Sequence, residues 1–385
     1  MRVLSHVNVY DAALDRIRYL FDEFEEVIVT TSGGKDSTVV YNLAMQVAEE
    51  KGRLPLKVMF IDQEAEWQSV IEYLRTVMSD ERVEPIWLQC PIRLFNATST
   101  DQPWLECWKE GDEWIRPKEE NSITENIFGA DRFKDMFEAY CKTMYPNTSV
   151  AQLSGVRCEE SPTRLFALTT SVCYKWITWG KIGDKDKNHY AFYPIYDWGY
   201  RDVWKAIHDN KWDYCRLYDQ MYQYGIKVRQ MRVSNVHHEQ AVKSLFFMQE
   251  VEPETWISVQ ERLRGVNSAA RLEDDFLNPQ ALPYMFNSWV EYRDYLLENL
   301  FSEKDQDDKG NKIQDIFAKR FARDHEMFDE QVHEGMVKMH IACILAGDYH
   351  GTKNGVWSAA NTRFTRSRLR VDAERRRRQA NERPA

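Results

Sequence analysis

The segment from Val27 to Asp62 constrains the fold of this chain more than any other. Val27–Val29 is a short β-branched run, too brief for a helix, and the glycine-containing stretch "SGGKDS" follows it. Apolar residues then recur at helical spacing until Gly52, and "LPLKVMFID" forms a second apolar run. A strand, a glycine loop, a helix and a second strand within about 35 residues make a βαβ unit. Such a unit sets its two strands parallel, so the sequence predicts an α/β fold.

Further apolar runs extend the predicted sheet. The stretches "EPIWLQC", "VAQLSGV" and "HYAFYPIYDW" indicate a third, fourth and fifth strand, and a helix over 159–176 is expected directly after the fourth. We therefore expect a doubly wound, mainly parallel five-stranded sheet. Beyond about Ser234 the strand signals stop and helical patterns such as "WISVQERLRGV" take over. This change predicts a helical C-terminal region.

Composition divides the chain into three predicted parts. Residues 1–234 form the α/β domain, 235–360 a helical domain and 361–385 a basic tail. Residues 91–148 are an insertion that carries Trp104, Trp108 and Trp114. These tryptophans could form a base-stacking or lid surface, but anchoring of the insertion to the core is the favoured interpretation.

The overall composition excludes several classes of protein. The chain has 385 residues, of which 43% are hydrophobic and 29% charged, as in folded globular proteins. No apolar run approaches the roughly 18 residues of a membrane span, and the N-terminus lacks a signal-peptide core, so a cytoplasmic location is expected. The seven cysteines contain no C-x-x-C pair, which argues against a local zinc ribbon or iron–sulfur cradle.

Charge is distributed unevenly along the chain. The net charge is −10, yet residues 361–385 hold nine arginines against three acidic residues. This arginine-rich tail could bind nucleic acid, an acidic partner or the acidic body of its own chain. A solvated, frayed end is the favoured interpretation.

The stretch Ser32–Ser37 is a candidate phosphate cradle. The P-loop motif requires Ser or Thr directly after its lysine, whereas here Asp36 stands between Lys35 and Ser37. Gly33 and Gly34 would let the backbone turn around an anion at a helix N-terminus, and Lys35 and the Ser32 and Ser37 hydroxyls would add donors. Asp36 could bind Mg²⁺ between itself and the phosphates, or it could cap the helix.

Two further stretches at predicted strand ends carry candidate site residues. Arg157 and Arg164, in "GVRCEESPTRL", suit phosphate or sulfate binding, although an Arg–Glu salt-bridge network at the helix start would use the same residues. Asp62 follows the second strand, where a carboxylate can meet a ribose hydroxyl or a metal, or can cap the next helix.

These motifs resemble those of the PP-loop ATP pyrophosphatases, within the adenine-nucleotide α-hydrolase (HUP-like) fold group. "SGGKDS" is similar to the pyrophosphate-binding loop of that superfamily. "FID", "GVRCEESPTR" and "YPIYDWGYRDVWKAI" are similar to the phosphoadenosine-phosphosulfate reductase branch. "VRQMRVSNVHHEQAVKSL" and "PETWISVQERLRGVNSA" look like a reductase-like subfamily of unknown function, which includes an immunoglobulin-binding regulator found beside a ParB-like protein.

The resemblance implies an ATP site and a reaction. ATP, with Mg²⁺ at Asp36, would place its phosphates in Ser32–Ser37 and its adenine near the strand that ends at Asp62. Such enzymes cleave ATP to AMP and pyrophosphate and attach AMP to an oxygen of an acceptor. The residues implied in catalysis are Lys35, Asp36, Arg157 and Arg164, and those implied in nucleotide binding also include Gly155, Glu160 and Ser161.

One departure from the family argues against sulfonucleotide reduction. A reductase needs a cysteine in a C-terminal E-C-G-x-H motif, and this chain has none, while Cys343 stands among apolar residues. The leading hypothesis is therefore adenylylation of an unidentified acceptor, for which the tail suggests nucleic acid. The alternatives are a sulfur-transfer protein without its own catalytic cysteine, and a nucleotide-sensing regulatory or defence subunit that acts with a ParB-like partner.

Overall fold

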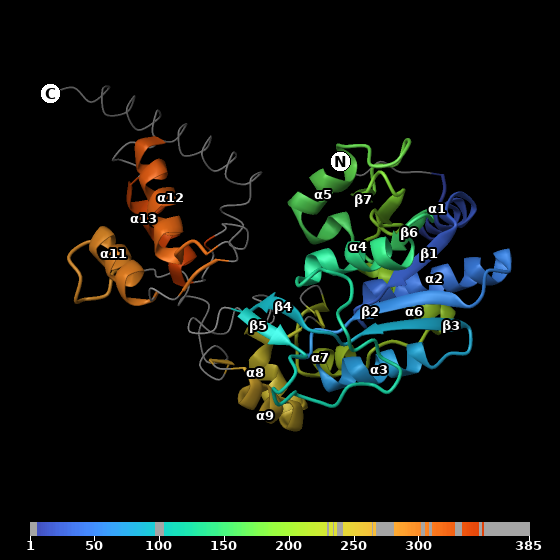
Figure 1. The fold of residues 1–385 in the computed structure, drawn as a ribbon, viewed down its shortest axis with the longest axis horizontal. Coiled ribbons are helices and arrows are strands. Elements are labelled where there is room, and N and C mark those ends of the chain that lie inside the picture. The colour runs from blue at the N-terminus through green and yellow to red at the C-terminus, as the bar shows by residue number, and fades with distance from the viewer. Residues whose placement is uncertain are drawn as a thin grey trace. The chain divides into compact units, whose positions relative to one another are not determined.

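The computed structural model describes residues 6–96, 104–228, 231–233, 235–236, 242–263, 265–266, 281–301, 305–307, 310–327, 333–345 and 349. The chain divides into two compact units (Figure 1). The described residues up to Leu263 belong to the first unit, and those from Gly265 onward belong to the second.

A six-stranded sheet forms the centre of the first unit. The order of its strands is β3-β2-β1-β6-β8-β7, where the first five are parallel and β7 runs antiparallel to β8. The bounds of the strands are β1 Glu26–Thr30, β2 Leu56–Ile61, β3 Val83–Leu88, β6 Val150–Leu153, β7 Gly180–Asp184 and β8 His189–Phe192.

Helices of the first unit flank this sheet (Figure 1). Val27, Ile28 and Val29 of β1 are at most 4% exposed, because β1 is central and covered on both faces. The bounds of the helices are α1 Val9–Glu23, α2 Lys35–Lys51, α3 Gln68–Met78, α4 Phe133–Met144, α5 Pro162–Thr169, α6 Tyr200–Asn210, α7 Leu217–Gln223, α8 Val242–Val251 and α9 Pro253–Arg262.

The predicted α/β class and mainly parallel sheet are confirmed, and the predicted number of strands is corrected from five to six. All five predicted strands are present. The sixth strand, β7, carries no strand signal in the sequence, because "GKIGD" contains two glycines and no apolar run. Its residues are exposed or half-buried at the edge of the sheet.

The helix expected over 159–176 is also corrected. A 3₁₀ turn over Cys158–Glu160 comes first, and α5 begins at Pro162 after the N-cap Ser161 and ends at Thr169. The chain then turns back, and the amide of Cys173 donates to the carbonyl of Ile177 at 2.8 Å. The continuous apolar pattern in this stretch thus spans two short helical segments and a turn.

The insertion between β3 and β6 is anchored to the sheet through its tryptophans. Strands β4 (Ile92–Phe95) and β5 (Trp104–Cys107) form an antiparallel hairpin that the sequence analysis did not predict. Trp108 is fully buried and its Nε1 donates to the carbonyl of Asp62 at 2.9 Å. Trp114 packs edge-on against Trp108, with 5.8 Å between the rings. These contacts anchor the insertion to the sheet rather than form an exposed stacking surface.

The described part of the second unit is helical, as predicted. Helices α11 (Trp289–Asn299), α12 (Ile313–Met327) and α13 (His333–Leu345) pack on one another, and Phe317 is buried among them. The basic tail, 361–385, lies outside the described residues, so its partners stay a prediction. The predicted domain limits also stay a prediction, although α8 and α9 belong to the first unit. Within the ranges given above, no helix has the length and apolar character needed to cross a membrane.

Candidate nucleotide-binding site

The predicted phosphate loop lies between the carboxyl end of β1 and the N-terminus of α2. Gly33 has a φ of +68°, and a Cβ there would lie 2.7 Å from Cγ1 of Val70, so conformation and space both favour glycine. Gly34 is the N-cap of α2 and provides no side-chain cap. The Ser37 hydroxyl donates to the Gly34 carbonyl at 2.8 Å and accepts from the Ser32 amide at 3.3 Å. Ser37 therefore shapes the loop from inside.

Lys35 is the buried cation of this loop. Only 6% of the residue is exposed, and its Nζ lies 3.1 Å from Oδ2 of Asp36 and 3.4 Å from the carbonyl oxygen of Met231. Its backbone amide donates to the hydroxyl of Tyr218 at 3.1 Å, and its ammonium lies over the Tyr218 ring. Burial lowers the pKa of Lys35, and the charge of Asp36 partly offsets this effect.

Asp36 joins the loop after β1 to the loop after β6. Its Oδ1 accepts from Nε of Arg157, while its Oδ2 faces Lys35. Arg157 is 4% exposed and also donates to Oε2 of Glu159 at 3.1 Å. These ion pairs bring together three of the four predicted catalytic residues.

Asp36 is the one residue of this site that is predicted to bind Mg²⁺. Both of its oxygens are occupied by Arg157 and Lys35. Over the described ranges, no three His, Cys, Asp or Glu side chains are grouped so that they could hold a metal. Mg²⁺ in nucleotide sites usually takes one or two carboxylates and completes its shell with phosphates and water, so one carboxylate is compatible with a nucleotide-borne ion. Asp36 as a Mg²⁺ ligand stays a prediction.

Gly155 explains why the loop after β6 can reach the phosphate loop. A Cβ on Gly155 would lie 2.5 Å from the backbone carbon of Asp36 and 2.6 Å from the amide nitrogen of Ser37. Backbone cannot yield in the way that a flexible side chain can. Gly155 is therefore required for the close approach that brings Arg157 to Asp36.

Arg164, Glu160 and Ser161 form a network at the start of α5. The Ser161 hydroxyl caps the helix by accepting from the Arg164 amide at 3.2 Å. The guanidinium of Arg164 is paired with the Glu160 carboxylate, which also accepts from the Arg157 amide at 3.4 Å. Burial and the neighbouring charge of Arg232 lower the pKa of Arg164. The salt-bridge alternative is present in the structure, and phosphate binding by Arg164 and Ser161 stays a prediction.

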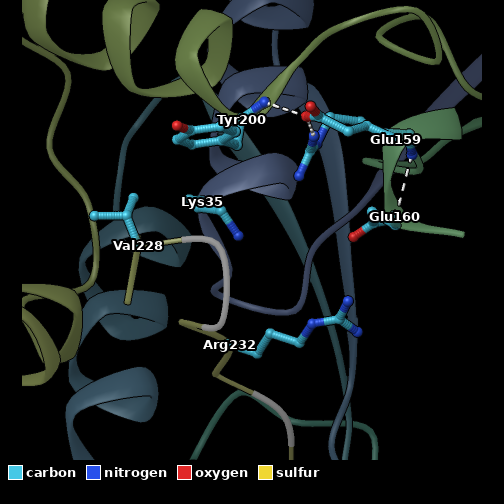
Figure 2. A pocket seen from close by; sticks show the side chains of 7 residues that line it. Lys35, Glu159, Glu160, Tyr200, Val228 and Arg232 are labelled. Carbon is cyan, nitrogen blue, oxygen red and sulfur yellow. Dashed lines mark hydrogen bonds and ion pairs between the residues drawn. The ribbon is translucent and has the colours of Figure 1, made fainter. Parts of the chain in front are cut away.

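A cavity of about 140 Å³ lies beside these residues (Figure 2). The N-terminal ends of α2 and α6 both reach it, through Lys35 and Tyr200. Pockets that enclose whole drug-sized ligands measure about 300–1,000 Å³, so this cavity suits a phosphate or pyrophosphate group and leaves a nucleoside outside. Its lining comes from four segments of the first unit: Lys35, Arg157, Glu159, Glu160, Tyr200, Val228 and Arg232.

Six contributors to this site were not predicted from the sequence: the cavity-lining residues Glu159, Tyr200, Val228 and Arg232, and the Tyr218 hydroxyl and Met231 carbonyl, which contact Lys35. Figure 2 shows Lys35, Glu160 and Arg232 turned toward the same space, with Tyr200 beside it. The stretch "VRQMRVSN" contains Arg232, and its two arginines were the only local signal.

Asp62 lies outside this cavity. Its side chain is fully buried, and Oδ2 accepts from Nε1 of Trp87 at 2.8 Å and from Nε2 of Gln89 at 3.0 Å. The Arg116 guanidinium contacts both oxygens, at 2.6 and 2.8 Å. Asp62 therefore does not line the phosphate-sized cavity, and its carboxylate is occupied by internal donors. Its predicted place near the adenine or ribose stays a prediction.

The cysteines offer no activated thiol at the site. All seven are free, and none lines the cavity. Burial raises the pKa of Cys90 to about 11 and that of Cys215 to about 12. Cys158 lies next to Arg157, yet burial raises its pKa as well. A raised pKa keeps a thiol protonated at neutral pH, and a protonated thiol is a poor nucleophile.

Comparison with protein families identifies the class of protein to which this fold and cavity belong. Residues 26–224, just over half of the chain, match the model of the phosphoadenosine phosphosulfate reductase domain. The chain belongs to this family, whose members share the PP-loop nucleotide-binding fold. Residues 225–354 match a second model, described as a domain of unknown function (DUF3440).

Individual relatives cover different shares of the chain. The uncharacterized protein YbdN of Escherichia coli K12 is 29% identical over 331 residues, which are 80% of this chain and 79% of YbdN. Sulfate adenylyltransferase subunit 2 of Mycobacterium tuberculosis is 42% identical over 69 residues, and the match spans only 18% of this chain and 22% of that protein.

Solved structures resemble the chain only distantly. FMN adenylyltransferase of Candida glabrata, with FMN and an ATP analogue, has a TM-score of 0.37 at 13% identity, over 61% of this chain and 66% of that one. Phosphoadenylyl-sulfate reductase of Candida auris has a TM-score of 0.32 at 12% identity, over 62% of this chain and 98% of that one. Likeness at this level carries no argument about activity.

Proposed function

We propose that this protein binds ATP and cleaves it between the α- and β-phosphates, so that AMP is attached to an acceptor oxygen and pyrophosphate leaves. The observation that carries the proposal is the position of Lys35. It is buried at the N-terminus of α2, after a turn at Gly33 that favours glycine, and it lines a cavity of phosphate size together with Arg157.

The proposed step requires stabilisation of negative charge and no protein nucleophile. An acceptor oxygen attacks the α-phosphorus, the bond to the bridging oxygen breaks, and the electron pair leaves with pyrophosphate while the acceptor proton passes to solvent. Lys35, Arg157 and the amides at the start of α2 are held in place before the reaction, so they can stabilise the departing charge without reorganising. Mg²⁺ carried by the nucleotide would neutralise part of the phosphate charge.

Two observations favour this reaction over sulfur transfer. Cys158, which follows the cavity-lining Arg157, is protonated at neutral pH because burial raises its pKa, so it is a poor sulfur nucleophile. The 69-residue likeness to a sulfate adenylyltransferase subunit, whose name describes adenylyl transfer, is consistent with the same half-reaction. The acceptor, the ParB-like partner, nucleic-acid binding by the tail and the cytoplasmic location are parts of the proposal that rest on the sequence alone.

The proposal is tested by measuring pyrophosphate release from ATP by the full chain and by two lysine variants. Lys35→Ala should reduce the rate by about 100-fold or more, because it removes a preorganised charge from the leaving group. Lys51→Ala, at the exposed end of the same helix, should leave the rate unchanged. Melting temperatures establish that both variants are folded.

The other outcomes favour the rival functions. ATP binding without pyrophosphate release would favour a nucleotide-sensing subunit. Release of sulfite from phosphoadenosine phosphosulfate in the presence of thioredoxin would favour sulfur transfer. Full activity of Lys35→Ala would contradict the assignment of the site.

A further inference from the structure

The residues that match the reductase domain supply only part of the cavity lining. That match ends at residue 224, whereas Val228 and Arg232 line the cavity, and the Met231 carbonyl accepts from Lys35 Nζ at 3.4 Å. These three residues fall at the beginning of the region that matches the domain of unknown function. One wall of the cavity therefore comes from a part of the chain to which no role is assigned.

The backbone on either side of Arg232 is held in place. Met231 is 2% exposed, and Val233 is 7% exposed. The amide of Val236 donates to the carbonyl of Ala65 at 3.1 Å, and the Asn235 side chain donates to the Gln63 side chain. Arg232 is thus carried on a buried, hydrogen-bonded stretch that is docked on the loop after β2.

Two further sets of contacts hold α8 and α9 against the loop after β2 and the start of α3. The Glu252 carboxylate accepts from the Gln68 and Ser69 amides, at 2.7 and 3.0 Å, and so caps the N-terminus of α3. Arg262 pairs with Glu64 at 2.6 Å and donates to the Glu106 carbonyl at 2.8 Å. Residues on both sides of α8 are therefore tied to the sheet, and the position of Arg232 is defined by the fold of the first unit.

The charges around the cavity favour an anion beside the glycine loop. Lys35, Arg157 and Arg232 all line the cavity. Asp36 pairs with Lys35 and Arg157, and Glu159 and Glu160 pair with Arg157 and Arg164, so these four cations are grouped with three carboxylates. The charge of Arg232 opposes that of both Lys35 and Arg164, and it contributes to the lowered pKa of each. The N-termini of α2 and α6 add their dipoles. An anionic group bound between these cations would relieve the repulsion.

We propose that Arg232 is a further phosphate-binding residue of this cavity, which contacts the pyrophosphate group from the stretch that packs beside the glycine loop. The beginning of the domain of unknown function then supplies one of the ligand contacts of the reductase-like domain. This inference rests on the proposed function, because it takes pyrophosphate as the group that occupies the cavity.

The test is calorimetric titration of inorganic pyrophosphate into the full chain and three variants. Arg232→Ala and Arg232→Gln should each weaken binding by about 10-fold or more, since each removes a charge-assisted hydrogen bond. Lys227→Ala removes an exposed positive charge five residues away, outside the cavity lining, and should leave the affinity unchanged. Arg232→Gln keeps a longer side chain than Arg232→Ala does. If Arg232→Ala lowers the melting temperature, the affinity of Arg232→Gln for pyrophosphate is the measurement that tests the proposal.

The outcomes separate the two proposals. If the unmodified chain fails to bind pyrophosphate, both the proposed function and this inference are wrong. If it binds, and Arg232→Gln binds equally well, only the role of Arg232 is overturned. An equal loss in Lys227→Ala would also overturn it, because the effect would then be one of net charge alone.

Discussion

The loops after the neighbouring strands β1 and β2 lie at the same edge of the sheet, but one borders a cavity and the other is buried. After β1, the loop Ser32–Ser37 borders a cavity whose charged lining consists of three cations and two carboxylates. After β2, three carboxylates, those of Asp62, Glu64 and Glu66, are at most 5% exposed. Parallel strands bring ligand-binding loops to this edge in general. The difference teaches that a polar residue at this edge indicates a ligand site only where its side chain also borders a cavity.

Charged groups are paired in both regions, but only those after β1 border the cavity. Glu64 accepts from the Trp108 amide at 2.8 Å and from Arg262 at 2.6 Å, and Arg116 contacts both oxygens of Asp62. This buried carboxylate cluster therefore joins the insertion and α9 to the sheet. At the glycine loop, the N-cap of α2 is Gly34, which has no side chain, and the Lys35 amide donates to the Tyr218 hydroxyl. The helix N-terminus borders the cavity, where its dipole favours an external anion.

The largest effect on stability is expected from Asp62→Ala. Removal of this carboxylate leaves the buried Arg116 guanidinium without its counter-ion, which should lower the free energy of unfolding by about 3–5 kcal/mol. The matched control, Asp22→Ala, breaks an exposed pair with Lys51 and should cost about 1 kcal/mol or less. Denaturant unfolding of both variants measures the difference.

The comparison also predicts what Asp62→Ala leaves intact. Under conditions where the variant is folded, its affinity for pyrophosphate should equal that of the unmodified chain, because Asp62 does not line the cavity. A variant that is stable but fails to bind would place Asp62 in the ligand site and break the distinction between the two regions.

Gly155→Ala should have the next largest effect. The added Cβ would meet the backbone of Asp36 and Ser37 at 2.5–2.7 Å, so the two loops must separate, at a cost of about 1–3 kcal/mol. Pyrophosphate binding should weaken along with stability, since Arg157 moves with its loop. Gly335→Ala, in α13, meets nothing within 4 Å and serves as the control. Unaltered binding by Gly155→Ala would show that the close approach is dispensable.

The smallest effect, when compared over a single pH unit, concerns the pH dependence of stability, through Glu66. Burial, followed by the charge of Asp62, raises the pKa of Glu66 well above its ordinary value. The folded state therefore holds this proton more tightly than the unfolded state does. Its contribution to stability is full below about pH 4.3 and is lost as the pH rises toward the folded pKa, by at most about 1.4 kcal/mol per pH unit.

Glu66→Gln removes this titration. The free energy of unfolding of the variant should fall less steeply with pH above about 4.3 than that of the unmodified chain. The measurement is denaturant unfolding of both proteins across the same pH range. Identical pH dependence of the free energy of unfolding would mean that Glu66 is ionised in the folded state and that water reaches the buried carboxylate cluster.

The part of the site that local sequence patterns could predict is the part built on consecutive residues. The β-branched run before "SGGKDS" and the helical spacing after it place Lys35 at a strand end. The rule that parallel strands share one edge brings Arg157 to the same place, and the ion pair with Asp36 confirms that these two loops meet.

The rest depends on contacts between distant segments. Met231 lies 196 residues from the Lys35 that it contacts, and no periodicity connects them. The closure of the loop after β2 depends on Arg116, 54 residues from Asp62, and on Arg262, 198 residues from Glu64. The edge strand β7 was missed for a different reason, because it buries too little to need an apolar pattern.

The central claim is that the glycine loop holds the pyrophosphate that leaves ATP. It is tested most directly by incubating the full chain with ATP labelled at the α-phosphate, with Mg²⁺ present, and separating the products by chromatography. The account predicts that the label appears in AMP or in an adduct of AMP, with one pyrophosphate released for each. Label in ADP, or ATP that remains bound but intact, would contradict it.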